Sequence, residues 1–414
     1  MIWLSKGGKY VAFDLHRQFL PPDHLDREDK NFTKGRVVHE VTEIPTFSGA
    51  DVLAQLKALQ PKVKGKGKAK AKGFEGYGEM HNWTHITPFS QLPYFKDLKL
   101  PYNIDVMHTE KNVAESLFHT ILNIPDKTKD NVKARADQQI ICDRPRLNMK
   151  PPTGGRKNWF KPDADFVLKP PEKKEVLIWL KQILKFTDGY ASNISKGVNL
   201  STGKVTGLKS HDYHVWIERI MPVMVRGYVP EHVWRVLAEL SHFFRTLCAK
   251  EVSKEVIEKL HKKAPELIVK LEKIFPPGFF TPMTHLILHL ANEVLLAGPV
   301  QNRWQYGPER QNKHLRRKCG NKAKIEASIA EAVILEEVSD LRTSYYPDHV
   351  PHLHNKVPRY NIEEPKYQPR LDLFNAQGGR AGASKSYNMP RQEWEDLMFY
   401  IMHNIREVEE VWMR

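Results

Sequence analysis

The sequence predicts a mainly α-helical protein, a helical bundle connected by proline-rich loops. Two segments repeat apolar residues at the spacing of one helix face. The first face, in residues 173–186, consists of Val176, Leu180, Ile183 and Leu184. The second, in residues 231–250, consists of Val233, Val236, Leu237, Leu240, Phe243, Phe244 and Leu247. The chain also has 28 prolines, which interrupt helices and central strands and so imply long irregular connections.

Further helices are expected on both sides of these two. Residues 51–59 predict a short helix with Asp51 as its cap. Ser253 can cap the helix that follows the second apolar face, and Pro222 and Pro265 should each kink or split a helix. Amphipathic helices are also expected over residues 282–296 and, at the end of the chain, over about 391–412.

Two linkers divide the chain. Residues 62–73 are rich in lysine and have no apolar face to bury. Residues 149–172 are rich in proline and cannot sustain a helix or a central strand. The predicted parts are therefore residues 1–61, residues 74–148, a helical domain at 173–345, and a C-terminal extension with the terminal helix at 346–414.

Charge and composition limit the classes of function. The chain has 64 Lys and Arg against 49 Asp and Glu, a net charge of +15, which favours nucleic acid or another polyanion as partner. Its 3 cysteines are few and far apart, which predicts a reducing compartment. Their spacing does not match that of zinc ligands. No targeting segment or membrane span is expected. The sequence has no glycine-rich phosphate-binding loop, so no nucleotide cofactor is expected.

The lysine-rich linker has two interpretations. Its lysines alternate with Gly, Ala and Val at Lys62, Lys64, Lys66, Lys68, Lys70 and Lys72. Such a run can serve as a phosphate-binding arm or a nuclear localisation signal, or it can be a solvated linker whose like charges only keep it extended. Both interpretations remain open from the residues alone.

The stretch LPYNIDVMHTEKNVAESLFHTILNIPDKTKDNVKARAD, residues 100–137, resembles the transposase of plant CACTA (En/Spm-type) mobile elements. Within it, a predicted helix has Leu117, Ile121 and Leu122 on its apolar face. Four further blocks, at 186–230, 273–290, 298–310 and 321–338, resemble the same family in the same order. The resemblance extends from about Tyr10 to Asn361, and five blocks in register are stronger evidence than one short motif.

The resemblance implies an RNase H-like transposase core followed by a helical domain of unknown function. In that family two aspartates upstream of the DVMH block and a later acid hold two metal ions. The segment GGKYVAFDLHRQFLPPDH resembles a family segment in which a Cys-x-x-Cys pair precedes the histidine, but His16 has no such pair here. We therefore expect an N-terminally truncated transposase, with residues 1–61 as an incomplete remnant of the core.

The resemblance places the third acid at Glu309, which would bind Mg²⁺ if the ancestral activity survives. The next residues of RWQYGPERQNKHLRRK would contact DNA through Arg310, Lys313, Arg316 and Arg317. The structural alternative is an ordinary Glu309 to Lys313 pair on a solvated helix. Gly307 and Pro308 depart from the family pattern, so the entry into this helix can differ.

Asp105 and His108 of the DVMH motif lie in the part of the family that cuts DNA, although such a pair can also be a buried hydrogen bond at a strand-to-helix junction. His211, Asp212 and His214 resemble a family signature of unassigned role. His285 and His289 lie four residues apart on one helix face, but Leu286 stands where a zinc protease needs glutamate, which favours a hydrogen-bonded histidine stripe.

Two functional hypotheses follow. The first is a fragment or domesticated relic of a Mg-dependent DDE-type transposase, DNA-associated but inactive alone, acting with other transposase subunits at element ends. The second is a non-catalytic nuclear protein that uses the helical domain to bind DNA or protein. Both place the chain in the nucleus.

Overall fold

The computed structural model describes residues 2–4, 10–13, 15–29, 40–61, 73–78, 80–152, 159–184, 193–344 and 388–404. The chain divides into two units, described separately below: residues 1–186 with 191–307, and residues 187–190 with 308–414. The lysine run at 62–72 lies outside the described residues.

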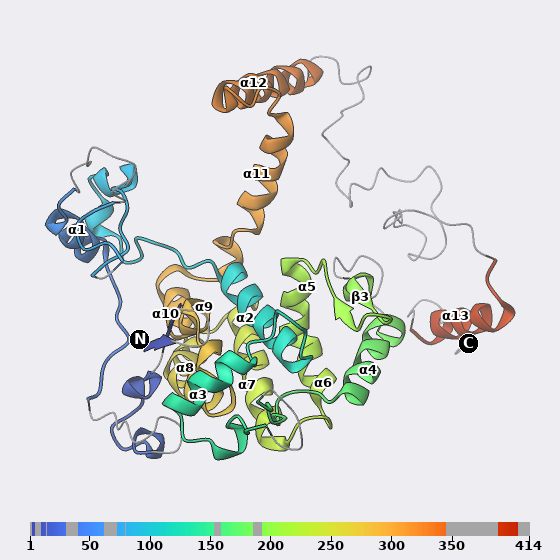
Figure 1. Ribbon diagram of the computed structural model, residues 1–414. Coiled ribbons are helices and arrows are strands. Elements are labelled where there is room, and N and C mark those ends of the chain that lie inside the picture. The colour runs from blue at the N-terminus through green and yellow to red at the C-terminus, as the bar shows by residue number, and fades with distance from the viewer. Residues whose placement is uncertain are drawn as a thin grey trace. The chain divides into compact units, whose positions relative to one another are not determined.

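The first unit is mainly helical, which confirms the predicted class (Figure 1). Its helices are α1 (Gly49–Ala58), α2 (Val106–Ile121), α3 (Val132–Ile141), α4 (Pro170–Ile178), α5 (Ser210–Val215), α6 (Met221–Val225), α7 (Glu231–Leu247), α8 (Lys254–Ile274), α9 (Pro282–His285) and α10 (Ile287–Ala297). Two antiparallel two-stranded sheets pair β1 (Ile2–Leu4) with β2 (Tyr10–Ala12) and β3 (Val198–Asn199) with β4 (Lys204–Val205).

The second unit contains most of α11 (Tyr306–Lys318), together with α12 (Ile325–Ser344) and α13 (Arg391–Asn404). Among the described residues of either unit, no helix combines the length and the apolar character that a membrane span requires.

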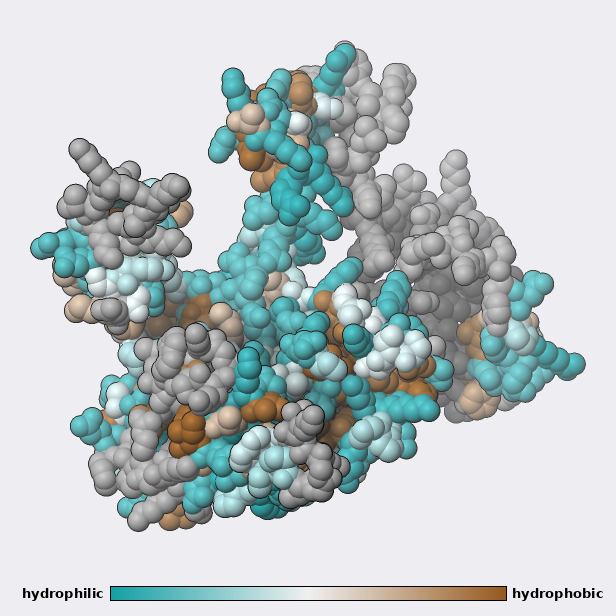
Figure 2. Space-filling model, in the orientation of Figure 1, coloured by the Kyte–Doolittle hydropathy of each residue, from teal (hydrophilic) through white to brown (hydrophobic). Residues whose placement is uncertain are grey.

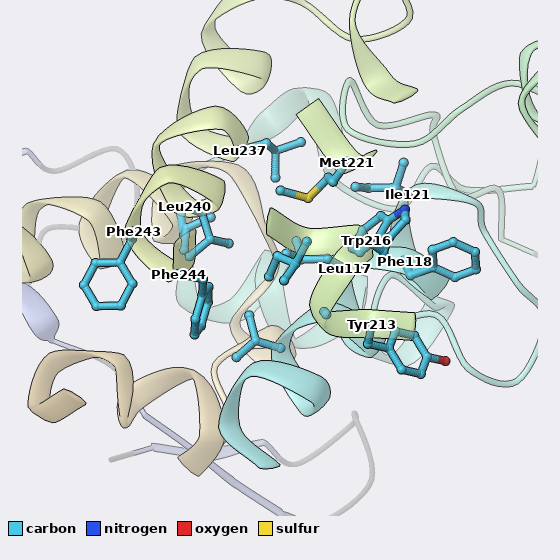
Figure 3. Packing of buried hydrophobic residues seen from close by; sticks show 14 of the residues in the cluster. Leu117, Phe118, Ile121, Tyr213, Trp216, Met221, Leu237, Leu240, Phe243 and Phe244 are labelled. Carbon is cyan, nitrogen blue, oxygen red and sulfur yellow. The ribbon is translucent and has the colours of Figure 1, made fainter. Parts of the chain in front are cut away.

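One hydrophobic core joins segments before and after the proline-rich stretch 149–172, and it also includes Ala164, Phe166 and Leu168 from within that stretch. It runs from Val106 in α2 to Val300 after α10, and it includes the buried faces of α5, α7 and α8. Figure 3 shows part of it, where Phe118 meets Trp216 edge to face with ring centroids 5.1 Å apart. The apolar face predicted for α7 is wholly buried, as are Leu117, Ile121 and Leu122 of α2, so both predictions are confirmed.

The apolar face predicted for residues 173–186 is wrong at one position. Val176 and Leu180 are buried, but the Ile183 side chain is 64% exposed. The reason is local, because the α-helix passes at Trp179 into a π-helical turn that ends at Ile183. A π turn holds more residues than an α turn, so the periodic face rotates away from the core.

Helix starts and prolines also correct the sequence prediction. Ser48, not Asp51, caps α1, and Asp51 is the third residue of a capping box in which its carboxylate accepts the Ser48 N–H. Pro265 does not split its helix, since α8 is continuous from Lys254 to Ile274. Pro222 lies in the first turn of α6, directly after a second π turn, η8 (Trp216–Ile220).

Candidate functional site: a buried carboxylate, histidine and cysteine cluster

Four side chains from distant parts of the sequence meet inside the first unit. Glu110 belongs to α2, His214 to α5, Glu218 to the π turn η8, and Cys248 is the C-cap of α7. One donor atom from each lies within 4.8 Å of the other three, and among the described residues this is the group with metal-ligand chemistry. We call these four residues the EHEC cluster.

Helix starts and ends position these side chains. Asp105 caps α2 by accepting the Met107 N–H at 3.1 Å, and the helix then directs Glu110 inward, where it is 2% exposed. Asp212 accepts the N–H groups of Lys209 and Asn193, at 2.7 and 3.1 Å, and so fixes the start of α5. The π turn that follows α5 contains Glu218, and π turns recur at functional sites.

The contacts within the EHEC cluster leave one Glu110 oxygen unsatisfied. His214 Nδ1 lies 2.6 Å from Glu110 Oε2 and 3.6 Å from Glu218 Oε1, and the Glu218 carboxyl also interacts with the Cys248 thiol. Glu110 Oε1 is buried and has no hydrogen-bond partner. A buried carboxylate oxygen without a partner costs free energy, so the cluster is incomplete as a hydrogen-bonding network.

Burial and mutual charge shift the titration of the cluster. Burial, helped by the charge of Glu110, raises the pKa of Glu218 to about 7. Burial opposes protonation of His214, but its hydrogen bond with Glu110 and the nearby carboxylates raise its pKa overall. Burial, then the charges of Glu110 and Glu218, raise the pKa of the Cys248 thiol well above its usual value. The raised pKa values favour the protonated forms of Glu218, His214 and Cys248, and a bound cation could take the place of these protons.

Aromatic side chains from residues 299–306 cover the cluster. Trp304 lies edge to face with His214, with centroids 6.3 Å apart, and Tyr306 lies edge to face with His211, at 6.4 Å. His211 stacks on His214 at 5.7 Å. Arg303 pairs with Glu293 at 2.9 Å, and Glu293 also accepts the Ile104 N–H just before α2. Three of the blocks that carry the family resemblance thus meet at one place.

The predicted pair Asp105 and His108 does form a hydrogen bond, with 2.5 Å between Oδ2 and Nδ1. The pair lies at the start of α2 and not at a strand-to-helix junction, and the His108 side chain is 56% exposed. Neither residue is a member of the EHEC cluster. Of the predicted signature residues, His214 is a cluster member, His211 stacks on it, and Asp212 accepts the N–H of Lys209, the N-cap of α5.

His285 and His289 form a different group. His285 Nδ1 lies 3.1 Å from His16 Nε2, and His16 Nδ1 bonds the Glu272 carboxylate. Phe13 stacks on His285 at 4.5 Å, and the His289 ring lies at 5.3 Å. Burial, with the charges of His16 and His289, lowers the pKa of His285 to about 3. His285 is therefore hydrogen-bonded to His16, in line with the structural interpretation, and His289 contacts it through its ring.

Glu309 lies exposed in the first turn of α11, within the second unit. The basic residues that follow it, Arg310, Lys313, Arg316 and Arg317, are exposed as well. Later in the helix, Lys318 pairs with Glu336 of α12, and His314 lies 3.3 Å from the same carboxylate. Glu309 is not part of the metal-ligand group formed by the described residues.

Glu110, Glu218 and Cys248 are absent from the site that the sequence predicts. The spacing of the three cysteines gives no metal signal, because the partners of Cys248 come from other helices. One local signal exists: His214 and Glu218 are four residues apart and can face the same side of a helix.

Fold and site together define a mainly helical protein with a buried acid, histidine and cysteine cluster. Residues 247–361 match the model of a family described as a domain of unknown function, DUF4218, which is found in transposase-like plant proteins. No curated protein and no solved structure matches the chain significantly. The matched region begins just before Cys248 and includes α8 to α12.

Proposed function

We propose that this chain is a transposase-derived nuclear protein of the CACTA kind that associates with DNA and does not cut it alone. The observation that supports this most directly is α11, a helix with five Lys and Arg side chains among its 13 residues and no buried residue. Figure 2 shows the surface of this helix as almost entirely hydrophilic. Arginine and lysine on an exposed helix are suited to phosphate contacts.

The charge of the rest of the chain supports the same partner. A net charge of +15 attracts a polyanion at long range. The lysine run from Lys62 to Lys72 would add nonspecific phosphate contacts. Such contacts are salt-dependent and need no base recognition.

The proposed absence of cleavage rests on the chemistry of phosphoryl transfer. A two-metal site needs several carboxylates that converge on ions about 4 Å apart. In the resembled family, Glu309 would supply one of three acids, and the resemblance assigns no residue of residues 1–414 to the other two. We propose that Mg²⁺ chemistry would require those acids from another transposase subunit, and that residues 1–61 are the remnant of an RNase H-like core.

A salt titration tests the DNA association. The test variant replaces Arg310, Lys313, Arg316 and Arg317 by Gln. If these residues neutralise about four phosphates, the slope of log K against log salt should become flatter by about 3 to 4. Fluorescence anisotropy with a labelled duplex at several salt concentrations measures both slopes.

The matched control replaces four exposed lysines of α8, Lys254, Lys259, Lys262 and Lys263, by Gln. Both variants lose the same charge, so a general charge effect would flatten both slopes equally. A slope that changes only in the α11 variant supports the proposal. Equal changes in the two variants would show that α11 is not a specific contact surface.

A second candidate function is protein binding through α12. This helix exposes apolar side chains, with Leu335 64%, Val338 56% and Leu341 65% exposed. Exposed apolar side chains grouped on one element often mark a partner surface. This alternative gains support if the wild-type chain shows no salt-dependent DNA binding.

A further inference from the structure

We propose that Glu110, His214, Glu218 and Cys248 form a binding site for one divalent transition-metal ion of the zinc type. The proposal concerns a position different from Glu309, and it does not depend on DNA binding. The site is built from α2, α5, η8 and the end of α7, within a single unit.

The spacing of the donor atoms fits such an ion. Ligands about 2.0 to 2.3 Å from zinc lie about 3.3 to 3.8 Å from one another in a tetrahedron. The four donor atoms here lie within 4.8 Å of one another. Adjustments of at most about 1 to 1.5 Å between donor atoms, within the reach of side-chain rotation, would complete the shell.

The unsatisfied Glu110 oxygen supports a cation at this position. Glu110 Oε1 has no hydrogen-bond partner although its side chain is only 3% exposed, and the Glu218 side chain beside it is only 7% exposed. Two buried carboxylates beside one imidazole form an arrangement that a cation would stabilise. The ion would displace the proton between His214 Nδ1 and Glu110 Oε2 and the proton of the Cys248 thiol, and both would pass to solvent.

The donor types select the class of metal. Imidazole nitrogen and thiolate sulfur favour Zn²⁺ or Co²⁺, whereas Mg²⁺ prefers oxygen ligands alone. Four protein donors leave no open position, which is typical of structural zinc. The ion would therefore be a structural metal that cross-links α2, α5 and the end of α7. Gln301, which donates to the Cys248 carbonyl, and His211, which stacks on His214, would hold the ligands in place.

The test uses the full chain, stripped of metal with a chelator and titrated with Co²⁺. We expect one equivalent to bind and to produce the charge-transfer absorption of a cobalt–thiolate bond. Cys248→Ser should abolish that absorption. The control Cys142→Ser removes another buried cysteine, on a different segment, and should leave the absorption unchanged.

A second variant covers the case in which Cys248→Ser does not fold. Glu218→Gln keeps the shape of the side chain and the thiolate absorption, but it should weaken Co²⁺ binding by at least about tenfold. Zn²⁺ should raise the melting temperature of the wild-type chain and raise it less in this variant. Wild-type protein that takes up no Co²⁺ would overturn the proposal. A cobalt–thiolate absorption that survives in Cys248→Ser, or that is lost in Cys142→Ser, would do the same.

Discussion

Two residues of the same type can have different environments in this protein, and the environment decides which chemistry each can take part in. His108 and His214 stand in comparable motifs, yet the His108 side chain is 56% exposed and the His214 side chain 16%. The sequence singled out His214, because it lies in a block that resembles a known family. It could not identify Glu110 or Cys248 as neighbours of His214, since contacts between distant segments depend on the tertiary fold.

Acid should destabilise the first unit partly through His285. Its pKa is about 3 in the folded chain against an ordinary value of 6.5. Between those values the unfolded chain binds a proton that the folded chain does not, so stability is complete above pH 6.5 and falls as the pH falls towards 3. The unfolding free energy would fall by at most about 1.4 kcal/mol per pH unit, and the partial exposure of the His285 ring reduces this loss.

Urea unfolding at several pH values measures this effect. His285→Gln should flatten the fall in unfolding free energy below pH 6.5, because the titrating group is gone. His16, His289 and Glu272 face this group and stay in place. The control is His232→Gln at an exposed position. An unchanged pH dependence in the His285 variant would contradict this account.

At the scale of elements, periodicity predicted the fold where the helix is regular. The apolar face of α7 was predictable because every position on it is buried, in a helix that contacts α6, α8, α10 and the π turn η8. The same reasoning failed at Ile183, since propensity and spacing do not reveal a π turn. The cap of α1 was misplaced by three residues because Ser48 and Asp51 act together in one capping box.

The buried face of α7 should dominate the stability of its unit. Leu240 is 0% exposed, so Leu240→Ala removes packing on all sides and should cost about 2 to 5 kcal/mol. The matched control is Leu25→Ala, the same chemical change at a side chain that is 89% exposed, with an expected effect within about 0.5 kcal/mol. Urea unfolding compares the two. Similar losses from both would mean that this core is not the stabilising element.

At the scale of the whole molecule, the spacing of apolar residues predicted the helical class, and composition gave the basic net charge, which is a sum over residues. The joining of residues 106–124 and 164–300 in one core could not be predicted, because it depends on contacts across a proline-rich segment. The same is true of the EHEC cluster, whose four residues are spread from position 110 to 248. The proposed function, DNA association without cleavage, combines the family resemblance with the exposed basic helix α11.

The most direct test of that function incubates the full chain with supercoiled DNA in Mg²⁺ or Mn²⁺ at low salt. We predict that the DNA migrates more slowly as a complex and is recovered intact after the protein is removed, since one acid cannot hold a two-metal site. The comparison variants are Glu309→Gln and, as a control on the next helix, Glu326→Gln. Metal-dependent nicking by the wild-type chain, abolished by Glu309→Gln and retained by Glu326→Gln, would contradict the account and identify an active nuclease.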